Sequence, residues 1–160
     1  MAQRYRKIDP RFWLDERVTT LGSLEKLIAL YCFTGQANRI GLYCLSPGQA
    51  AEDLALTLQT FLKGFEKVCG RLRFGWDKPL RIVYLPRWWK YNCPENPNVL
   101  KSCLSDLHDV PQTQLFNDFS ANIAYLPETF HQTFRTVTET FAKGLGERMP
   151  DQEQEQEQEQ

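Results

Sequence analysis

The chain has 160 residues, of which 42% are hydrophobic and 24% are charged, a balance typical of a globular protein and not of a disordered one. No apolar run approaches the roughly 18 residues that a membrane-spanning helix needs, and no apolar segment follows the basic N-terminus, so we expect neither a membrane protein nor a signal peptide. The five cysteines are widely spaced, with no Cys-x-x-Cys pair, which indicates reduced thiols in a cytoplasmic protein.

The formal net charge of −1 conceals an asymmetry along the chain. Residues 1–93 contain 15 Lys and Arg against 8 Asp and Glu, a balance of +7, whereas residues 94–160 contain 4 against 12, a balance of −8. A basic front part favours a polyanionic partner. The acidic rear part could fold over the front part and compete with that partner.

The first elements expected are two helices and a strand. Asp9 can cap a short helix, and Ser23 can begin a second helix, whose apolar residues recur at helical spacing as far as Gly35. Residues 39–45 are apolar and β-prone, which predicts a short strand.

Two further helices are expected almost back to back. Ser46 caps the first and Thr57 the second. Ala55 stands in the turn between them, where glycine is common because a left-handed residue is often needed, so either this turn has another geometry or the protein tolerates some strain. The second of these helices is expected to turn one continuous apolar stripe toward the core, made of Leu58, Phe61, Leu62, Phe65, Val68 and Cys69.

A hairpin is expected next, because β-prone runs at residues 71–76 and 80–85 flank a turn at residues 77–79. The order helix, strand, helix, tight turn, helix, hairpin is that of a winged helix-turn-helix. The expected fold is therefore mostly α with a small β-hairpin wing, and residues 1–93 form a DNA-binding domain.

Residues 94–146 are expected to form a helical extension. Asn96 and Pro97 can open its first helix. In its last helix, four apolar residues recur at steps of four, three and four, namely Phe130, Phe134, Val137 and Phe141. Such a seam docks either on the domain or on a second copy, and we expect it to join chains into a homo-oligomer. Residues 147–160 are rich in Glu and Gln, which predicts a disordered tail, a solvated helix or a linker.

Candidate DNA contacts lie on the polar face of the helix that follows Thr57. Gln59 and Thr60 would face base edges, and Lys63 and Lys67 would lie near phosphates or guanines. Backbone contacts are expected from cations of the wing and of an N-terminal arm, namely Arg71, Arg73, Lys78, Arg81, Arg4, Arg6 and Lys7. The alternative is an ordinary solvated helix face, and Glu66 on that face would repel phosphate.

Three aromatic residues, Trp88, Trp89 and Tyr91, lie beside Arg87 and Lys90. Bases of single-stranded nucleic acid stack on such rings, which makes single-stranded DNA a second candidate ligand. The favoured alternative is that the rings close the core, since they directly follow a strand that must pack.

Four stretches of the chain together resemble the N-terminal domain of phage replisome-organiser proteins, over about residues 4–120. They are Ile8-Asp9 with Phe12-Trp13 and Asp15; Leu45-Ser46 leading into residues 50–54; Tyr84-Leu85-Pro86 followed by residues 89–92; and residues 94–99 with Lys101 and Leu104. The resemblance implies a winged helix like that of DnaD-type primosomal initiators, which binds the replication origin. It also implies a C-terminal region that engages the replicative helicase or its loader, joined through a Glu/Gln-rich linker.

No catalytic motif is evident. The chain has no phosphate-binding G-x-x-x-x-G-K-[ST] loop, no H-E-x-x-H and no G-x-S-x-G. The neighbours Glu52 and Asp53 fit helix-surface charge better than an acid–base pair. A zinc site of Cys93, Cys103 and His108 is disfavoured, because their spacing matches no common ligand pattern. We therefore expect a protein that is not an enzyme and uses no metal or cofactor.

The leading hypothesis is a DNA-binding module of a phage or prophage replication initiation protein. One rival is a transcriptional regulator on the same fold. Another is a protein-docking module that never touches DNA, because winged helices serve that purpose as well.

Overall fold

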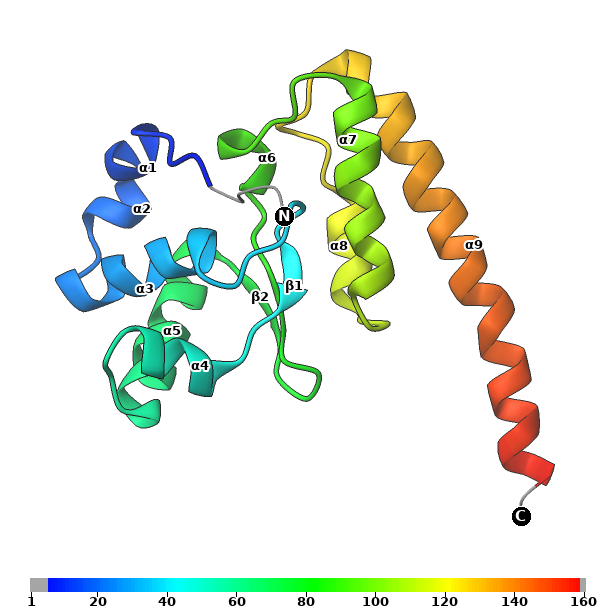
Figure 1. Cartoon of the computed structure of the whole chain (residues 1–160), viewed down its shortest axis with the longest axis horizontal. Coiled ribbons are helices and arrows are strands. Elements are labelled where there is room, and N and C mark those ends of the chain that lie inside the picture. The colour runs from blue at the N-terminus through cyan, green and yellow to red at the C-terminus, as the bar shows by residue number, and fades with distance from the viewer. Residues whose placement is uncertain (1–5, 159–160) are drawn as a thin grey trace, which may run out of the picture.

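The computed structural model describes the backbone of residues 6–158 and the side chains of residues 6–145. It is mostly helical with one small antiparallel sheet, as predicted (Figure 1). The N-terminal part contains α1 (Arg11–Leu14), α2 (Glu16–Thr19), α3 (Ser23–Thr34), β1 (Leu42–Cys44), α4 (Pro47–Asp53), α5 (Leu58–Leu72), β2 (Gly75–Asp77), β3 (Ile82–Tyr84) and α6 (Trp88–Tyr91). The C-terminal part contains α7 (Pro97–Leu104), the 3-10 helix η1 (Ser105–Asp109), α8 (Leu115–Ala121) and α9 (Glu128–Gln158).

The sheet has the order β1-β3-β2, with both pairings antiparallel. Val83 in the central strand is paired with Tyr43 on one side and Trp76 on the other. The predicted hairpin is confirmed, but its first strand begins later than expected. Residues 71 and 72 belong to α5, because Leu72 continues the buried apolar face of that helix, and the left-handed backbone of Arg73 (φ 58°) then ends it.

The predicted N-caps of α4 and α5 are confirmed. The Ser46 side chain accepts a hydrogen bond from the backbone N–H of Gln49 at 3.2 Å, and the Thr57 side chain accepts one from that of Thr60 at 3.1 Å. Ala55 in the turn between the helices has φ 55°, so the turn keeps the left-handed geometry and alanine adopts it. L-residues other than glycine adopt it at a cost, so this turn holds stored strain.

One hydrophobic core runs through both parts of the chain. The Trp89 ring contacts Phe119 of α8 and Phe134 of α9, with centroids 6.4 and 6.3 Å away, and the Tyr84 ring lies edge-on to Phe119. The predicted boundary after residue 93 therefore falls inside a single core.

Polar contacts also tie the two parts together. The Thr113 hydroxyl donates to the buried Asp77 carboxylate at 2.6 Å, which fastens the segment before α8 to β2. Arg39, in the loop before β1, donates to Asp106 of η1 at 2.8 Å.

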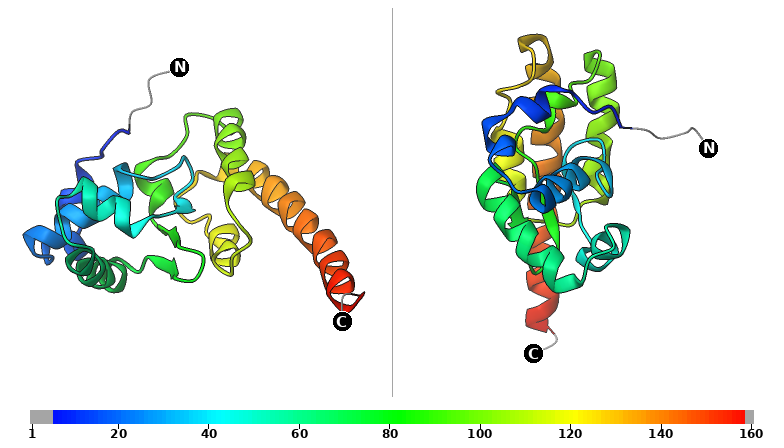
Figure 2. Two further views of the ribbon diagram at one scale, coloured as in Figure 1. Left: turned by 60° about the horizontal axis from the view of Figure 1, so that its bottom comes forward. Right: turned by 90° about the vertical axis from the view of Figure 1, so that its left-hand side faces the viewer.

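The apolar seam of α9 docks on its own chain. Phe130 and Phe134 are buried against the core, and Val137 and Phe141 pack partly onto it. This corrects the expectation that Phe130 and Phe134 join chains, whereas Val137 and Phe141 stay partly exposed, and for them the homo-oligomer remains a prediction. Beyond it, α9 continues as a helix to Gln158 and extends away from the body (Figures 1 and 2). Within residues 6–158, no helix combines the length and apolar character that crossing a membrane requires.

Candidate nucleic-acid interface

Side-chain hydrogen bonds hold α4 against α3. The Tyr31 hydroxyl on α3 donates to one oxygen of Asp53 at the end of α4, at 2.6 Å, and Gln49 donates to the other oxygen at 2.8 Å. Burial, followed by the hydrogen bond to Asp53, raises the pKa of Tyr31 to about 12. The phenol therefore stays a hydrogen-bond donor to Asp53 well above neutral pH, and this bond ties the end of α4 to α3.

The outer face of α5 differs from the predicted one. Phe61, Phe65 and Val68 are buried as expected, but Leu58 and Leu62 are 51% and 39% exposed. The expected apolar stripe was too wide. The helix turns about 100° per residue, and its buried arc is centred on Phe61, Phe65, Val68 and Leu72, with Gly64 along one edge. The two leucines lie on the opposite edge of that arc, next to exposed residues.

The predicted base-reading residues of α5 do not all point the same way. Gln59 and Lys63 are exposed, and among the described residues neither side chain has a hydrogen-bond or ion-pair partner. The Thr60 hydroxyl accepts a hydrogen bond from the Thr57 hydroxyl at 2.8 Å, so it takes part in the N-cap. Gln59 and Lys63 are therefore the predicted polar groups best placed to meet a ligand.

Two predicted cations of α5 are directed toward α2 and α3. Lys67 Nζ lies 3.8 Å from a Glu25 carboxylate oxygen. Arg71 Nε donates to the Thr20 hydroxyl at 2.9 Å. The Lys67 side chain is still 61% exposed, and such a surface pair is weak enough for phosphate to replace it.

The hairpin lies beside α5 along one edge of the molecule, as the left view of Figure 2 shows. Its turn presents the exposed cations Lys78 and Arg81, and the exposed Arg73 stands between α5 and the hairpin. The edge-to-face contact of Phe65 with Trp76, at 5.0 Å between ring centroids, fixes β2 against α5. The wing cations and the outer face of α5 thus belong to one rigid surface.

The N-terminal arm does not join this surface through Arg6. The Arg6 guanidinium donates to the Ala37 carbonyl at 2.7 Å and lies 5.8 Å from the Trp88 ring centroid. Lys7 is exposed beside α1 and α6, lining a small hollow with Phe12 and Tyr91. Arg4 lies outside the described residues.

The aromatic group beyond β3 closes the core. Trp88 and Trp89 are buried, with Trp88 stacked on Phe33, so neither ring offers an open face to a base. This corrects the base-stacking interpretation for both tryptophans.

Tyr91 is half-buried, and its hydroxyl donates to Asp15 at 3.2 Å. Asp15 also pairs with Arg87. Burial pushes the pKa of Asp15 upward, but the Arg17 backbone N–H and the Arg87 charge outweigh it and hold the pKa below its ordinary value.

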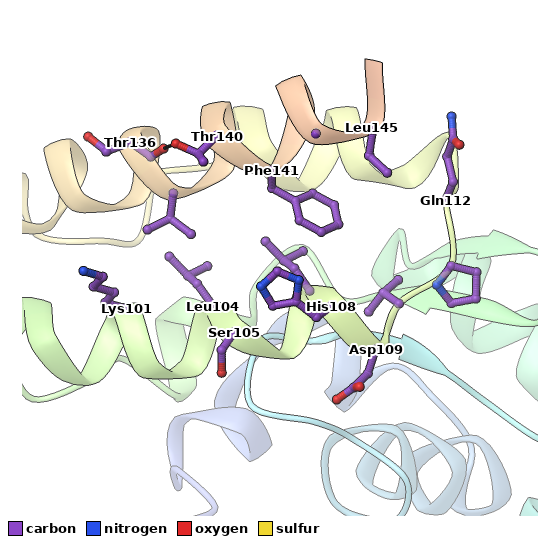
Figure 3. A pocket seen from close by; sticks show the side chains of 15 residues that line it. Lys101, Leu104, Ser105, His108, Asp109, Gln112, Thr136, Thr140, Phe141 and Leu145 are labelled. Atoms are coloured by element: carbon purple, nitrogen blue, oxygen red, sulfur yellow. Dashed lines mark hydrogen bonds between the residues drawn. The ribbon is translucent and has the colours of Figure 1, made fainter. Parts of the chain in front are cut away.

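A groove of about 890 Å³ opens where α9 diverges from α7 and η1 (Figure 3). Phe141 of α9 and His108 of η1 face one another across it, with ring centroids 5.9 Å apart. Leu104 and Val137 contribute apolar walls, and Lys101 lies at one end. Among the residues that the structure describes, no three His, Cys, Asp or Glu side chains cluster as metal ligands would.

Comparisons with known proteins provide no relative for the chain. No protein-family model, no curated protein and no solved structure matches it. Function must therefore be inferred from the residues of the site.

Proposed function

We propose that the N-terminal part of this chain is a winged helix-turn-helix that binds duplex DNA. In this proposal α5 is the recognition helix, and the β2–β3 hairpin is the wing. The observation that carries it is the packing of the hairpin against α5 through Phe65 and Trp76, with exposed cations on both elements: Lys63 on α5, and Lys78 and Arg81 at the hairpin turn.

The dimensions and chemistry of B-DNA suit that surface. The major groove is about 12 Å wide and admits an α-helix, and helix-turn-helix proteins read bases with the N-terminal residues of the recognition helix. Gln59 and Lys63 lie in the first two turns of α5. The cations of the hairpin would meet phosphates on either side of the groove, where they add affinity without sequence choice.

We further propose that the protein serves in replication initiation of phage or prophage type. The resemblance in residues 4–120 motivates this role, with the helicase or its loader as partner of the C-terminal region. The partly covered groove between α9 and η1 is one place where such a partner would dock.

One observation favours the rival function of protein docking. Leu58 and Leu62 expose apolar surface on the same face of α5, and exposed apolar patches often mark protein contacts. The exposed cations Lys63, Lys78 and Arg81 on α5 and the hairpin argue for a polyanion instead.

Fluorescence anisotropy with labelled duplex and single-stranded DNA, repeated at rising salt, separates these functions. We expect duplex binding whose logarithm falls linearly with the logarithm of salt concentration, with a slope that counts the phosphates neutralised. Tighter binding to the single strand would contradict recognition of duplex DNA by α5. We do not expect it, because the tryptophans that would stack bases are buried. No binding to either form would leave protein docking as the function.

A further inference from the structure

Two exposed leucines occupy the N-terminal half of α5, where a recognition helix meets bases. Leu58 and Leu62 are four residues apart and therefore neighbours on one side of the helix. They are 51% and 39% exposed, although a helix with so pronounced an apolar face could have buried them. Gln59 and Lys63 continue the same exposed surface around the helix.

The major groove offers one strong apolar feature, the C5-methyl group of thymine. Apolar side chains recognise it by contact, whereas the other base edges present hydrogen-bond donors and acceptors. A glutamine amide can pair with both N6 and N7 of adenine. Leucine and glutamine side by side on α5 are therefore complementary to the two halves of an A·T pair.

We propose that α5 reads A·T pairs in the major groove, with Leu58 and Leu62 contacting thymine methyl groups and Gln59 contacting adenine. The inference rests on the proposed function, because it applies only if α5 enters duplex DNA. It adds to that function the class of DNA sequence that α5 would select.

The surrounding charges favour DNA as the occupant over an apolar protein surface. Lys63 follows Leu62 around the exposed side of α5, and Arg73, Lys78 and Arg81 lie at its end and on the adjacent hairpin. A protein covering the two leucines would desolvate some of these cations, whereas phosphates would pair with them. Glu66, four residues after Leu62, is the one carboxylate on this face of α5, and it confines base reading to the first two turns.

The test begins with selection of bound duplexes from a pool of randomised sequence. We expect the selected duplexes to be enriched in A·T pairs at the positions that α5 covers. Each thymine of the selected duplex is then replaced by deoxyuridine, which removes the methyl group and keeps the base pair. Losing two methyl contacts should weaken binding by the wild-type protein about fifteenfold, at about fourfold for each buried methyl.

The variant with both Leu58→Ala and Leu62→Ala connects the effect to these side chains. Both positions are exposed, and alanine is a better helix former, so the variant should fold. It is expected to bind the thymine and deoxyuridine duplexes equally. Leu14→Ala, at a 76% exposed position in α1, is the matched control and should keep the full preference for thymine.

Each outcome decides the inference. A wild-type protein that binds both duplexes equally, or a double variant that keeps the thymine preference, would overturn the leucine contacts while duplex binding stands. A pool that yields no enriched sequence would overturn base reading in the same way. No binding to any duplex would overturn the proposed function itself, together with this inference.

Discussion

Gly64 of α5 lies directly against Ile28 of α3, and a Cβ atom on Gly64 would stand 2.4 Å from the Ile28 Cδ1 atom. Both residues are buried, and Ile28 has no exposed surface. The missing side chain thus sets how closely the proposed recognition helix approaches the core.

Gly64→Ala is expected to destabilise the protein, although alanine favours helices. The clash in a packed core costs about 1–3 kcal/mol, which exceeds the roughly 0.5–1 kcal/mol gained by removing glycine from a helix. Gly70→Ala is the matched control, since a Cβ there has no neighbour within 4 Å, and it should stabilise. Urea denaturation measures both changes. Equal effects of the two substitutions would contradict close packing at Gly64.

Ile28→Val should partly rescue Gly64→Ala, because valine lacks the Cδ1 atom that the new methyl group meets. Alone, this substitution costs about 0.5–1.5 kcal/mol. The free energies of unfolding of the two single variants and the double variant form a mutant cycle, in which the double variant should lose less than the sum of the single losses. A strictly additive result would show that the two side chains do not meet.

Ala55→Gly should stabilise the protein by about 1 kcal/mol, because glycine adopts the left-handed backbone at φ 55° without the penalty that alanine incurs. Ala142→Gly, at an exposed position within α9, is the opposing control and should destabilise by about 0.5–1 kcal/mol. The melting temperature measured by thermal denaturation should therefore rise for Ala55→Gly and fall for Ala142→Gly.

Lys63→Ala together with Lys67→Ala is expected to weaken duplex binding by about 1–3 kcal/mol in total and to reduce the salt slope. Lys63 should account for the larger share, since Lys67 lies near Glu25. Lys101→Ala, at an exposed position on α7, is the control, because it removes one positive charge outside the proposed DNA-binding surface. Anisotropy titrations that leave the affinity of the double variant unchanged would remove α5 from the interface.

The contact of Arg39 with Asp106 should make stability sensitive to acid. Burial raises the pKa of Asp106, but the hydrogen bonds and charge of Arg39 outweigh it and hold the pKa below its ordinary value of 3.8. A carboxylate with a lowered pKa stabilises the folded state fully above its ordinary pKa, and this contribution is lost as the pH falls through the folded value.

Asp106→Asn should therefore cost about 1–2 kcal/mol at neutral pH, and the difference from wild type should shrink as the pH falls below 3.8. Asp109→Asn, at an exposed position in the same 3-10 helix, controls for the change in net charge. Urea denaturation across the acid range makes the comparison. A difference that persists at low pH would mean that the ion pair is not its source.

The local features of this fold were predictable, because they depend on neighbours in sequence. The N-caps Ser46 and Thr57 each follow from the chemistry of one or two residues, whereas the left-handed backbone of Ala55 goes against the preference of alanine. The burial of Leu58 and Leu62 was predicted wrongly. Periodicity identifies the apolar side of a helix, but only the packed neighbours determine how wide the covered arc is.

Contacts between residues that are far apart in the sequence could not be predicted either. The spacing of Phe130 and Phe134 predicts an apolar seam, yet it does not say whether that seam meets its own chain or another. The same holds for Trp88 and Trp89, whose covering rings come from α3, α8 and α9. Gly64 gives no signal in the apolar pattern of α5, because it has no side chain, although its position against Ile28 sets how closely the two helices pack.

The core that runs through both parts of the chain determines what can be exchanged in evolution. A recombination that kept residues 1–93 and replaced the rest would uncover Trp89 and Tyr84 and remove the Thr113 hydroxyl that donates to Asp77. Shuffling of this module is therefore expected only in units that include α7, α8 and the first turns of α9. Any new fusion partner would begin beyond that point, along the polar stretch of the last helix.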